Sequence, residues 1–489
     1  MKKLFYLFVS GVLLWSCSDK DDDAFVPDPS EDLEIHDFVW KGMNTWYFWQ
    51  EEVNDLGDDR FASSEEYEDF LNNYATPEGL FDHLIYEDGT VDRFSWIVDD
   101  YEVLLSSFRG ESDSFGFEIG GLVQVNDAND VILYVGYVVP DSPADDAGMS
   151  RGDIVYKFDN VALNTSNYQV VNNFYSNESI RLEFATVSNG IITPTGKSST
   201  LNLRSVQENP VHFSEVLNYG GRKIGYLVYH AFRNTYNKEL NDVFEDFKNS
   251  GIEELVLDLR YNGGGSVSTS AYLASMIYGD AAAEKEVFAT LAYNSKNPRE
   301  GGSYPFFDKA DTYDKSTGKN NGTITINRLN SLTRVYVLTS GDTASASEMI
   351  INGLKPFMEV IVIGETTYGK NVGSQTLFDS SDFGTRNINP NHKYAMQPIT
   401  FKIYNKNGES DYTHGFDPDI LVEEYHSYEN IRAFGDTEES LLSAALNDIS
   451  GFSARSMVSP SETDIKALKG LKEQRFSKEM YIVPGEIQP

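Results

Sequence analysis

The pattern of apolar and polar residues changes along the chain, and each change marks a predicted domain. Apolar residues recur at helical spacing after residue 33, so residues 33–108 are predicted to form a small helical domain. Two segments within it, 63–66 and 76–77, have the capping residues and the proline that are typical of helix starts. The aromatic residues of 40–49 are interpreted as the core of this domain.

Short β-rich runs replace the helical pattern between residues 109 and 205. The runs 131–139 and 179–187 consist mainly of branched and aromatic residues, and turn-forming residues separate them. Residues 109–205 are therefore predicted to form a separate β-rich domain.

Strand and helix patterns alternate between residues 206 and 450, which predicts a third domain. The expected strands cover 223–230, 254–260, 334–340 and 359–364, and the expected helices cover 237–249, 268–278 and a segment that begins near 345. Such alternation is typical of a mostly parallel sheet with helices on its faces. The polar stretch 280–330 is expected to be irregular, and the extension 451–489 receives no function. The predicted fold class is multidomain α+β.

The charge and the histidine content indicate which ligands and macromolecular partners the sequence disfavours. The 489 residues include 76 acidic and 39 basic side chains, which gives a formal net charge of −37, and no basic stripe offsets it. A surface of this charge repels nucleic acid. The seven histidines show no metal-ligand spacing. The sequence therefore predicts neither a nucleic-acid partner nor a metal or other cofactor.

The first residues indicate export. Residues 1–16 combine a basic start with a short apolar run, as in a signal peptide, and Cys17 is the only cysteine of the chain. Residues 14–17 resemble a bacterial lipobox, which implies that Cys17 is lipidated and that residues 17–32 form a flexible linker. The acidic run 18–23 resembles the surface-export tether of Bacteroidota lipoproteins. The expectation is a protein anchored by lipid in the bacterial cell envelope, at the outer membrane and exposed on the cell surface.

Three segments that follow predicted strands carry the candidate chemistry. They are the glycine-rich 258–265, the turn 339–350 that contains Ser345, and the turn 364–375 that contains Lys370. Groups at the carboxyl ends of strands in an open α/β sheet converge on one site. A serine hydroxyl attacks an amide when a neighbour takes its proton, and a lysine amine with a lowered pKa can do so. The pair Ser345 and Lys370 therefore predicts nucleophile and general base.

The same segments resemble a known family. An S-A-S-E sequence at 345–348, a lysine in a G-K turn 25 residues after the serine, and the L-D-L-R-x-N-G-G-G run at 257–265 resemble the C-terminal processing peptidases of the tricorn-core, or S41, type. This resemblance covers about 109–425. It implies a ClpP/crotonase-like α/β peptidase core over 206–450 and a serine endopeptidase that acts on proteins or peptides.

Further residues are expected to support the reaction. The N–H groups of Ala346, at a helix start, and of Gly264, chosen among three adjacent glycines, can form an oxyanion hole. The resemblance implies that Glu348 or Gln375 orients the lysine. The chain departs from the family pattern because Asn371 replaces the usual glycine after the lysine and because Gln375 lies one residue further on.

The β-rich domain resembles bacterial PDZ domains along residues 141–155. Upstream, Ser114, Phe115, Gly116 and Phe117 resemble the loop that receives the terminal carboxylate of a peptide. Backbone N–H groups can hold a carboxylate, and an open strand edge can pair with the peptide that precedes it. The domain 109–205 is therefore expected to capture the C-termini of substrates.

Several alternatives remain open at this point. Ser345 and Glu348 also fit an ordinary capping box, which would make both residues structural. Ser347 is a second candidate nucleophile. His230, His414 and Asp417 could contribute to a Ser-His-Asp triad, whose order along the chain varies between folds.

A second class of function is a non-catalytic surface lipoprotein that only binds peptides. Such a binding module has no need for both Ser345 and Lys370, which disfavours it. A purely structural lipoprotein would leave the glycine-rich segments unexplained.

Overall fold

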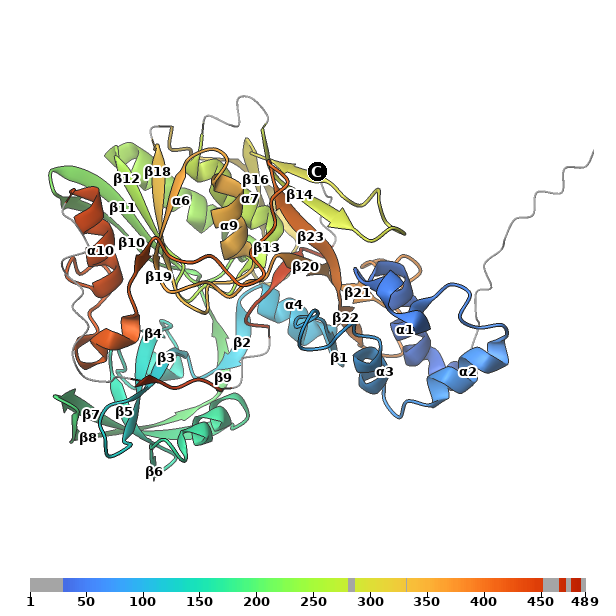
Figure 1. Ribbon diagram of the computed structural model, residues 1–489, viewed down its shortest axis with the longest axis horizontal. Coiled ribbons are helices and arrows are strands. Elements are labelled where there is room, and N and C mark those ends of the chain that lie inside the picture. Colours follow the sequence, from blue (N-terminus) through green and yellow to red (C-terminus); the bar gives the residue numbers. More distant parts are fainter. Residues whose placement is uncertain (1–29, 280–285, 331, 452–465, 472–475, 485–489) are drawn as a thin grey trace, which may run out of the picture.

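The structure is a computed structural model that describes residues 30–279, 286–330, 332–451, 466–471 and 476–484. The predicted signal peptide and Cys17 lie outside the described residues. Figure 1 shows three bodies: an N-terminal helical region, a β-rich domain and a larger α/β domain that contacts both. Among the described residues, no helix has the length and apolar character needed to cross a membrane.

The helical region begins where the pattern predicts it. Its helices are α1 (Glu34–Trp46), α2 (Ser64–Asn72), α3 (Pro77–His83) and α4 (Tyr101–Phe108). The Ser63 side chain accepts a hydrogen bond from the backbone of Glu66, and Thr76 caps α3, so both predicted helix starts are confirmed. Trp40 and Tyr47 are buried in the core, as expected of the aromatic cluster. Strand β1 (Trp96–Val98) pairs with β22 (Ala395–Gln397) of the α/β domain and docks the region on it.

The β-rich domain is one sheet in the order β25-β3-β4-β5-β7-β8. The strands β3 (Phe117–Gln124), β4 (Val131–Val138), β5 (Ile154–Phe158), β7 (Ser179–Ser188) and β8 (Ile191–Asn202) follow the chain, and β6 (Val161–Ala162) pairs with β5. A ribbon of β2 (Glu111–Ser114) and β9 (Arg204–Gln207) leads into and out of the domain. The outer edge of β3 is paired with β25 (Lys466–Ala467), which comes from the far end of the chain.

The α/β domain contains the predicted mostly parallel sheet, in the order β10-β11-β12-β18-β19-β24. Only β10 runs antiparallel to its neighbour. The strands are β10 (Val211–Tyr219), β11 (Arg222–Tyr229), β12 (Glu254–Asp258), β18 (Arg334–Thr339), β19 (Glu359–Gly364) and β24 (Ile420–Leu421).

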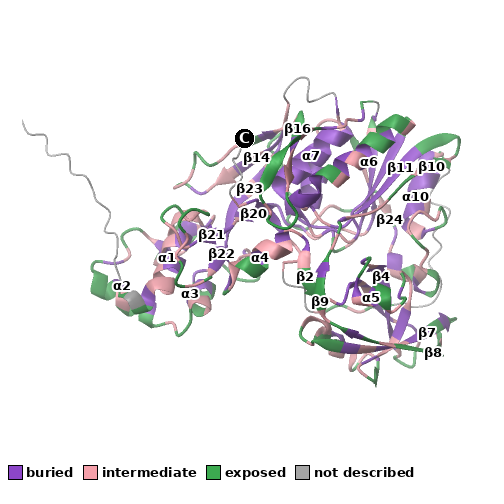
Figure 2. Ribbon diagram, turned by 180° about the vertical axis from the view of Figure 1, so that it is seen from behind, coloured by how far each residue is buried: buried purple, intermediate pink, exposed green. Residues whose placement is uncertain are grey.

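Helices cover both faces of this sheet, so its alternate residues enter two different cores. The helices α6 (Asn237–Ser250), α7 (Val267–Ile277) and α9 (Ala346–Leu354) pack on one face, and α10 (Ser440–Ile449) packs on the other. Figure 2 shows α7 and the central strands as buried, and every residue of α7 is buried. Burial on both faces explains why these strands read as continuous apolar runs.

A second sheet lies beside the first, and one sequence expectation fails there. Its order is β13-β26-β20-β23-β14-β15, with β13 (Gly265–Ser266), β26 (Met480–Ile482), β20 (Val372–Gln375), β23 (Ile399–Asn405), β14 (Val287–Tyr293) and β15 (Ser303–Pro305). The stretch 280–330 was expected to be irregular, but β14 is an internal strand because its apolar residues pack in the main core. The extension after 451, left without a function, supplies β26.

Candidate active site

Ser345 lies at a sharp turn between the end of β18 and the start of α9. Its backbone has φ 64° and ψ −115°, a conformation that L-residues rarely adopt. The side chain is buried, and its Oγ has no hydrogen-bond partner among the described residues. Strained backbone of this kind clusters at functional sites, where the surrounding structure maintains it. The turn therefore presents an unengaged hydroxyl at the carboxyl end of the parallel sheet.

Lys370 is buried at the start of the segment that leads into β20. Its Nζ donates to the backbone oxygen of Lys478 at 2.7 Å and lies 3.8 Å from the Glu479 carboxylate. The Phe94 ring lies 4.8 Å from the same nitrogen. Burial lowers the pKa of Lys370, and the opposing effect of Glu479 and more distant carboxylates does not cancel the shift. A neutral amine, able to accept a proton, is thereby favoured.

Glu348 connects the nucleophile turn with the lysine turn. Its carboxylate accepts hydrogen bonds from the backbone N–H groups of Ser345 and Lys370, both at 2.8 Å. It also accepts from the N–H of Gly369 at 2.7 Å and from the Thr367 hydroxyl at 2.6 Å. Burial raises the pKa of Glu348, while these hydrogen bonds oppose the rise. Glu348 thus holds the backbones of both residues rather than the lysine amine. Ser345 and Glu348 also have the arrangement of the capping box considered above, although the Ser345 Oγ has no partner at full hydrogen-bond geometry among the described residues.

The other sequence candidates lie in different environments. Gln375 is in β20, where its side-chain oxygen accepts a hydrogen bond from Tyr293 at 3.4 Å. The Ser347 hydroxyl donates to the backbone oxygen of Asn262 at 3.0 Å, which gives it a structural partner inside the helix start. No hydrogen bond joins Lys370 to either residue among the described contacts.

The histidine triad is not assembled in this structure. His230 is buried and packs against Tyr137 with ring centroids 3.8 Å apart, and Asp417 accepts a hydrogen bond from Thr366. Burial lowers the pKa of His230. Because Ser345 Oγ has no hydrogen-bond partner among the described residues, neither His230 nor His414 is bonded to it.

The glycine-rich loop packs directly against the nucleophile turn. A Cβ at Gly264 would lie 2.7 Å from the Ser345 Cβ and 3.0 Å from the Ala346 nitrogen, so this approach requires glycine, and Gly264 also has φ 112°. The Gly264 N–H donates to the Asn262 side chain at 2.9 Å, whereas the N–H of Gly265 donates to the Glu479 backbone oxygen at 2.5 Å. Of these two N–H groups, that of Gly265 binds Glu479, a residue of the C-terminal extension, whereas that of Gly264 binds within its own loop.

We expect Gly264→Ala to lower kcat/KM for peptide hydrolysis by about 10²-fold or more, because displacing reacting groups by about 1 Å costs that much. The added Cβ would press on Ser345. Gly251→Ala is the matched control: Gly251 also has positive φ, but a Cβ there meets nothing within 4 Å. Equal activity of the two folded variants would contradict the assignment of this loop to the site.

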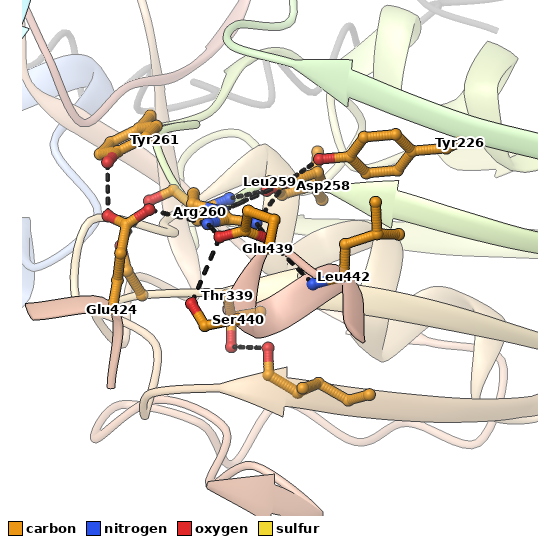
Figure 3. A network of polar contacts seen from close by, with 12 residues as sticks. Tyr226, Asp258, Leu259, Arg260, Tyr261, Thr339, Glu424, Glu439, Ser440 and Leu442 are labelled. Carbon is orange, nitrogen blue, oxygen red and sulfur yellow. Dashed lines mark hydrogen bonds and ion pairs between the residues drawn. The ribbon is translucent and has the colours of Figure 1, made fainter. Parts of the chain in front are cut away.

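A buried network of charges supports the glycine-rich loop (Figure 3). The Arg260 guanidinium, 1% exposed, bonds both oxygens of Asp258 and both oxygens of Glu439, and its Nη1 donates to Glu424 at 2.7 Å. Burial by itself lowers the pKa of Arg260, but the surrounding carboxylates outweigh it and raise the pKa overall. Burial raises the pKa of Glu424, yet Arg151 and Arg260 bring it down to about 2. These opposite charges therefore favour the ionised forms of Arg260 and Glu424.

Arg151 extends this network into the β-rich domain. It donates to Glu424, to the backbone oxygen of Gly136 and to the backbone oxygen of Arg432. Tyr261, at the beginning of the glycine-rich segment, donates to the same Glu424 carboxylate. These contacts fix the β-rich domain to the end of β12, where the glycine-rich segment begins. The sequence did not reveal this network because its acidic members, Glu424 and Glu439, follow no recognisable pattern.

Comparisons with known proteins identify related peptidases. The model of "Peptidase family S41" matches residues 223–422, and the model of "Peptidase S41 N-terminal domain" matches residues 34–96. Two similar curated proteins are carboxyl-terminal-processing peptidase 2 of Arabidopsis thaliana, 28% identical over 58% of this chain and 50% of the relative, and the carboxyl-terminal-processing protease of a Synechocystis strain, 24% identical over 58% of each. The chain thus spans about half the length of these relatives.

A solved structure from Bacteroides fragilis, described as an S41 protease, is similar over 85% of this chain and 97% of its own length. The two share 27% identity with a TM-score of 0.64. Its likeness covers the mixed α/β fold with the helical N-terminal region. The matched domains, and their order along the chain, show that this protein belongs to peptidase family S41.

Proposed function

We propose that this protein is a serine endopeptidase in which Ser345 is the nucleophile and Lys370 the general base. The observation that carries the proposal is the Glu348 carboxylate, which binds the backbone N–H groups of both residues and so fixes them in one buried site. An unengaged hydroxyl and a lysine whose pKa is lowered by burial are the two groups that such a mechanism requires. The curated relatives named as carboxyl-terminal-processing enzymes support the same reaction.

The reaction proceeds in two halves. Neutral Lys370 takes the proton of the Ser345 hydroxyl as Oγ attacks the peptide carbonyl, and N–H groups of Ala346 and of the glycine-rich loop stabilise the oxyanion. The ammonium then gives its proton to the leaving amine, which departs and leaves an acyl-enzyme. Water, deprotonated by the same amine, releases the new carboxyl terminus and restores the hydroxyl.

Capture of substrates by the β-rich domain is part of the proposal. The loop of Ser114, Phe115, Gly116 and Phe117 precedes β3, and Gly116 has φ 79° in a position where a Cβ would lie 2.0 Å from the Ser142 side chain. The outer edge of β3 accepts an added strand, since β25 already pairs with it. Addition of a strand to an open edge is the way PDZ domains bind peptides.

The proposed location is the bacterial cell envelope, with the protein held at the outer membrane through lipid on Cys17 and exposed on the cell surface. The support is the sequence of residues 1–23, which lies outside the described residues. The test is incorporation of a labelled fatty acid in the expressing cell, which Cys17→Ala should abolish.

We expect the soluble form without residues 1–17 to cut unfolded casein internally, with a rate that rises with pH through the pKa of Lys370. Burial places this pKa below the ordinary lysine value, so activity is present above the lowered pKa and is lost as the pH falls through it. New termini identified by mass spectrometry, and kcat/KM measured between pH 5 and 10, provide the check. A rate independent of pH over this range, or intact casein at every pH, would contradict the mechanism.

A further inference from the structure

The second sheet contains a strand that separates the two halves of the proposed site. Strand β26 (Met480–Ile482) lies between β13 and β20 and is parallel to both. Strand β13 continues from the glycine-rich loop, and β20 continues from Lys370. Neighbouring strands lie about 4.8 Å apart, so without residues 480–482 a slot one strand wide would remain between the oxyanion side and the base side.

The backbone before β26 forms hydrogen bonds with polar groups of the proposed site. The oxygen of Lys478 accepts the hydrogen bond of the Lys370 amine at 2.7 Å, and the oxygen of Glu479 accepts that of the Gly265 N–H at 2.5 Å. The oxygen of Ser477 lies so close to Gly263 that a Cβ there would be 1.7 Å away. The main chain of residues 477–479 thus passes over the glycine-rich loop and accepts the hydrogen bond of the proposed base.

Side chains hold this segment in place. Tyr481 stacks on Phe108 of the helical region with centroids 3.8 Å apart, and Lys478 forms an ion pair with Asp342 at 2.7 Å. The Glu479 carboxylate accepts a hydrogen bond from Trp96 at 3.0 Å. Met480 and Ile482 are buried in the main core. The segment is therefore bound by side chains on both of its flanks.

The preceding part of the same extension lies along the β-rich domain. Lys466 and Ala467 pair antiparallel with Gln124 and Val123 of β3, and the Leu468 N–H donates to Leu122 at 2.9 Å. The direction of this pairing takes the chain toward the Ser114–Phe117 loop. This is the direction that a peptide must have if its terminal carboxylate is to reach that loop.

We propose that residues 466–471 and 476–484 form an internal pseudosubstrate, a segment of this chain that fills both the outer edge of β3 and the space between β13 and β20 beside the proposed catalytic residues. The structure is then the latent form of the enzyme, and other peptides enter only after the segment leaves. The inference rests on the proposed function of the site, and it adds a regulatory occupant that belongs to the chain itself.

Competition between this segment and an added peptide should change the apparent KM rather than kcat. A tethered segment acts at an effective concentration of about 1 mM, so it raises the apparent KM of an added peptide without changing the chemistry. Deleting residues 464–489 should lower the apparent KM for a casein-derived peptide about tenfold or more and leave kcat within about threefold. An unchanged KM in the folded deletion variant would overturn the proposal.

A second variant tests the full chain, in case the deletion variant does not fold. Ser374 and Tyr481 are paired residues of β20 and β26. Their spacing of about 4.8 Å suits a disulfide, whose Cα atoms lie about 4.4–6.8 Å apart. In the soluble form without Cys17, the double variant S374C/Y481C contains only these two cysteines. The oxidised form should be inactive and should recover on reduction to the rate of its reduced control. Equal rates before and after reduction would overturn the proposal.

A peptide-binding measurement tests this inference independently of the proposed reaction. A fluorescent peptide with the sequence of residues 464–484 should bind to the deletion variant that also carries Ser345→Ala, and should bind at least tenfold more weakly to the full chain with Ser345→Ala. Equal binding to both, or binding to neither, would overturn the inference. If no variant cleaves casein while the binding difference holds, the peptidase proposal fails and the internal occupant remains.

Discussion

Ser345→Ala is expected to lower kcat for casein cleavage by about 10⁴-fold or more, and Lys370→Ala by about 10²–10⁴-fold. The serine variant loses the atom that forms the acyl-enzyme, whereas the lysine variant loses only the proton acceptor. Because the two groups act in one step, the double variant should be no slower than about the slower single variant. The assay uses the soluble form in both the full-length and the 464–489-deleted chain, so that latency does not mask the loss.

The matched control for the nucleophile is Ser347→Ala. This second serine of the same turn is also buried, but its hydroxyl donates to the Asn262 backbone, so its loss should cost about 1 kcal/mol of stability and little activity. Circular dichroism confirms that each variant is folded. Full activity in Ser345→Ala, or a loss in Ser347→Ala equal to that in Ser345→Ala, would reject Ser345 as the nucleophile.

Arg260→Leu should cause the largest loss of stability of the substitutions considered. Arg260 forms ion pairs with the buried carboxylates of Asp258, Glu424 and Glu439. Among the described residues, Arg151 would still pair with Glu424 and Glu439 after the removal of Arg260. Removing one partner of a buried ion pair costs about 3–5 kcal/mol, since the other charge stays desolvated. For a domain of this size the expected fall in Tm is about 6–20 °C. Differential scanning calorimetry at neutral pH measures it.

Two further arginine variants control this experiment. Arg386 forms an ion pair with Asp382, but its side chain is 85% exposed, so Arg386→Leu should lower Tm by no more than about 2 °C. Arg260→Lys keeps the charge and loses the planar fork that binds two carboxylates, so its Tm should fall between those of the wild type and Arg260→Leu. If Arg260→Leu and Arg386→Leu melt alike, the buried network does not stabilise the domain.

Much of the architecture could be predicted from periodicity because the elements concerned are long and bury a regular face. The four strands predicted for the parallel sheet lie within two residues of their expected bounds, and α6 covers its predicted helix, because apolar residues must face one core or the other. Strands β10 and β24 of the same sheet were not predicted. The proposed nucleophile and base were chosen from a short motif with a fixed spacing. Their common contact with Glu348 was not foreseen, because it joins backbone groups of two turns.

The features that sequence reasoning missed are short or depend on distant partners. Strand β14 has an apolar run, V-F-A-T-L-A-Y, that could have been recognised, but the polar residues around it obscured the signal. Strand β26 has three residues, too few for any periodicity, and its place in the sheet depends on pairing with β13 and β20. The conformation of such a segment is determined by long-range pairing, which a local pattern does not contain.

With Ser345 as the proposed nucleophile, its unusual backbone means that the protein accepts lower stability in exchange for activity. A residue with φ 64° and ψ −115° is strained by roughly 1–3 kcal/mol unless it is glycine. The most stable chain would therefore have glycine at this position and no hydroxyl. Among inactive variants, Ser345→Ala preserves the strain of the active enzyme, whereas Ser345→Gly would release it and melt higher. Conditions that relax this turn should weaken catalysis before they unfold the domain.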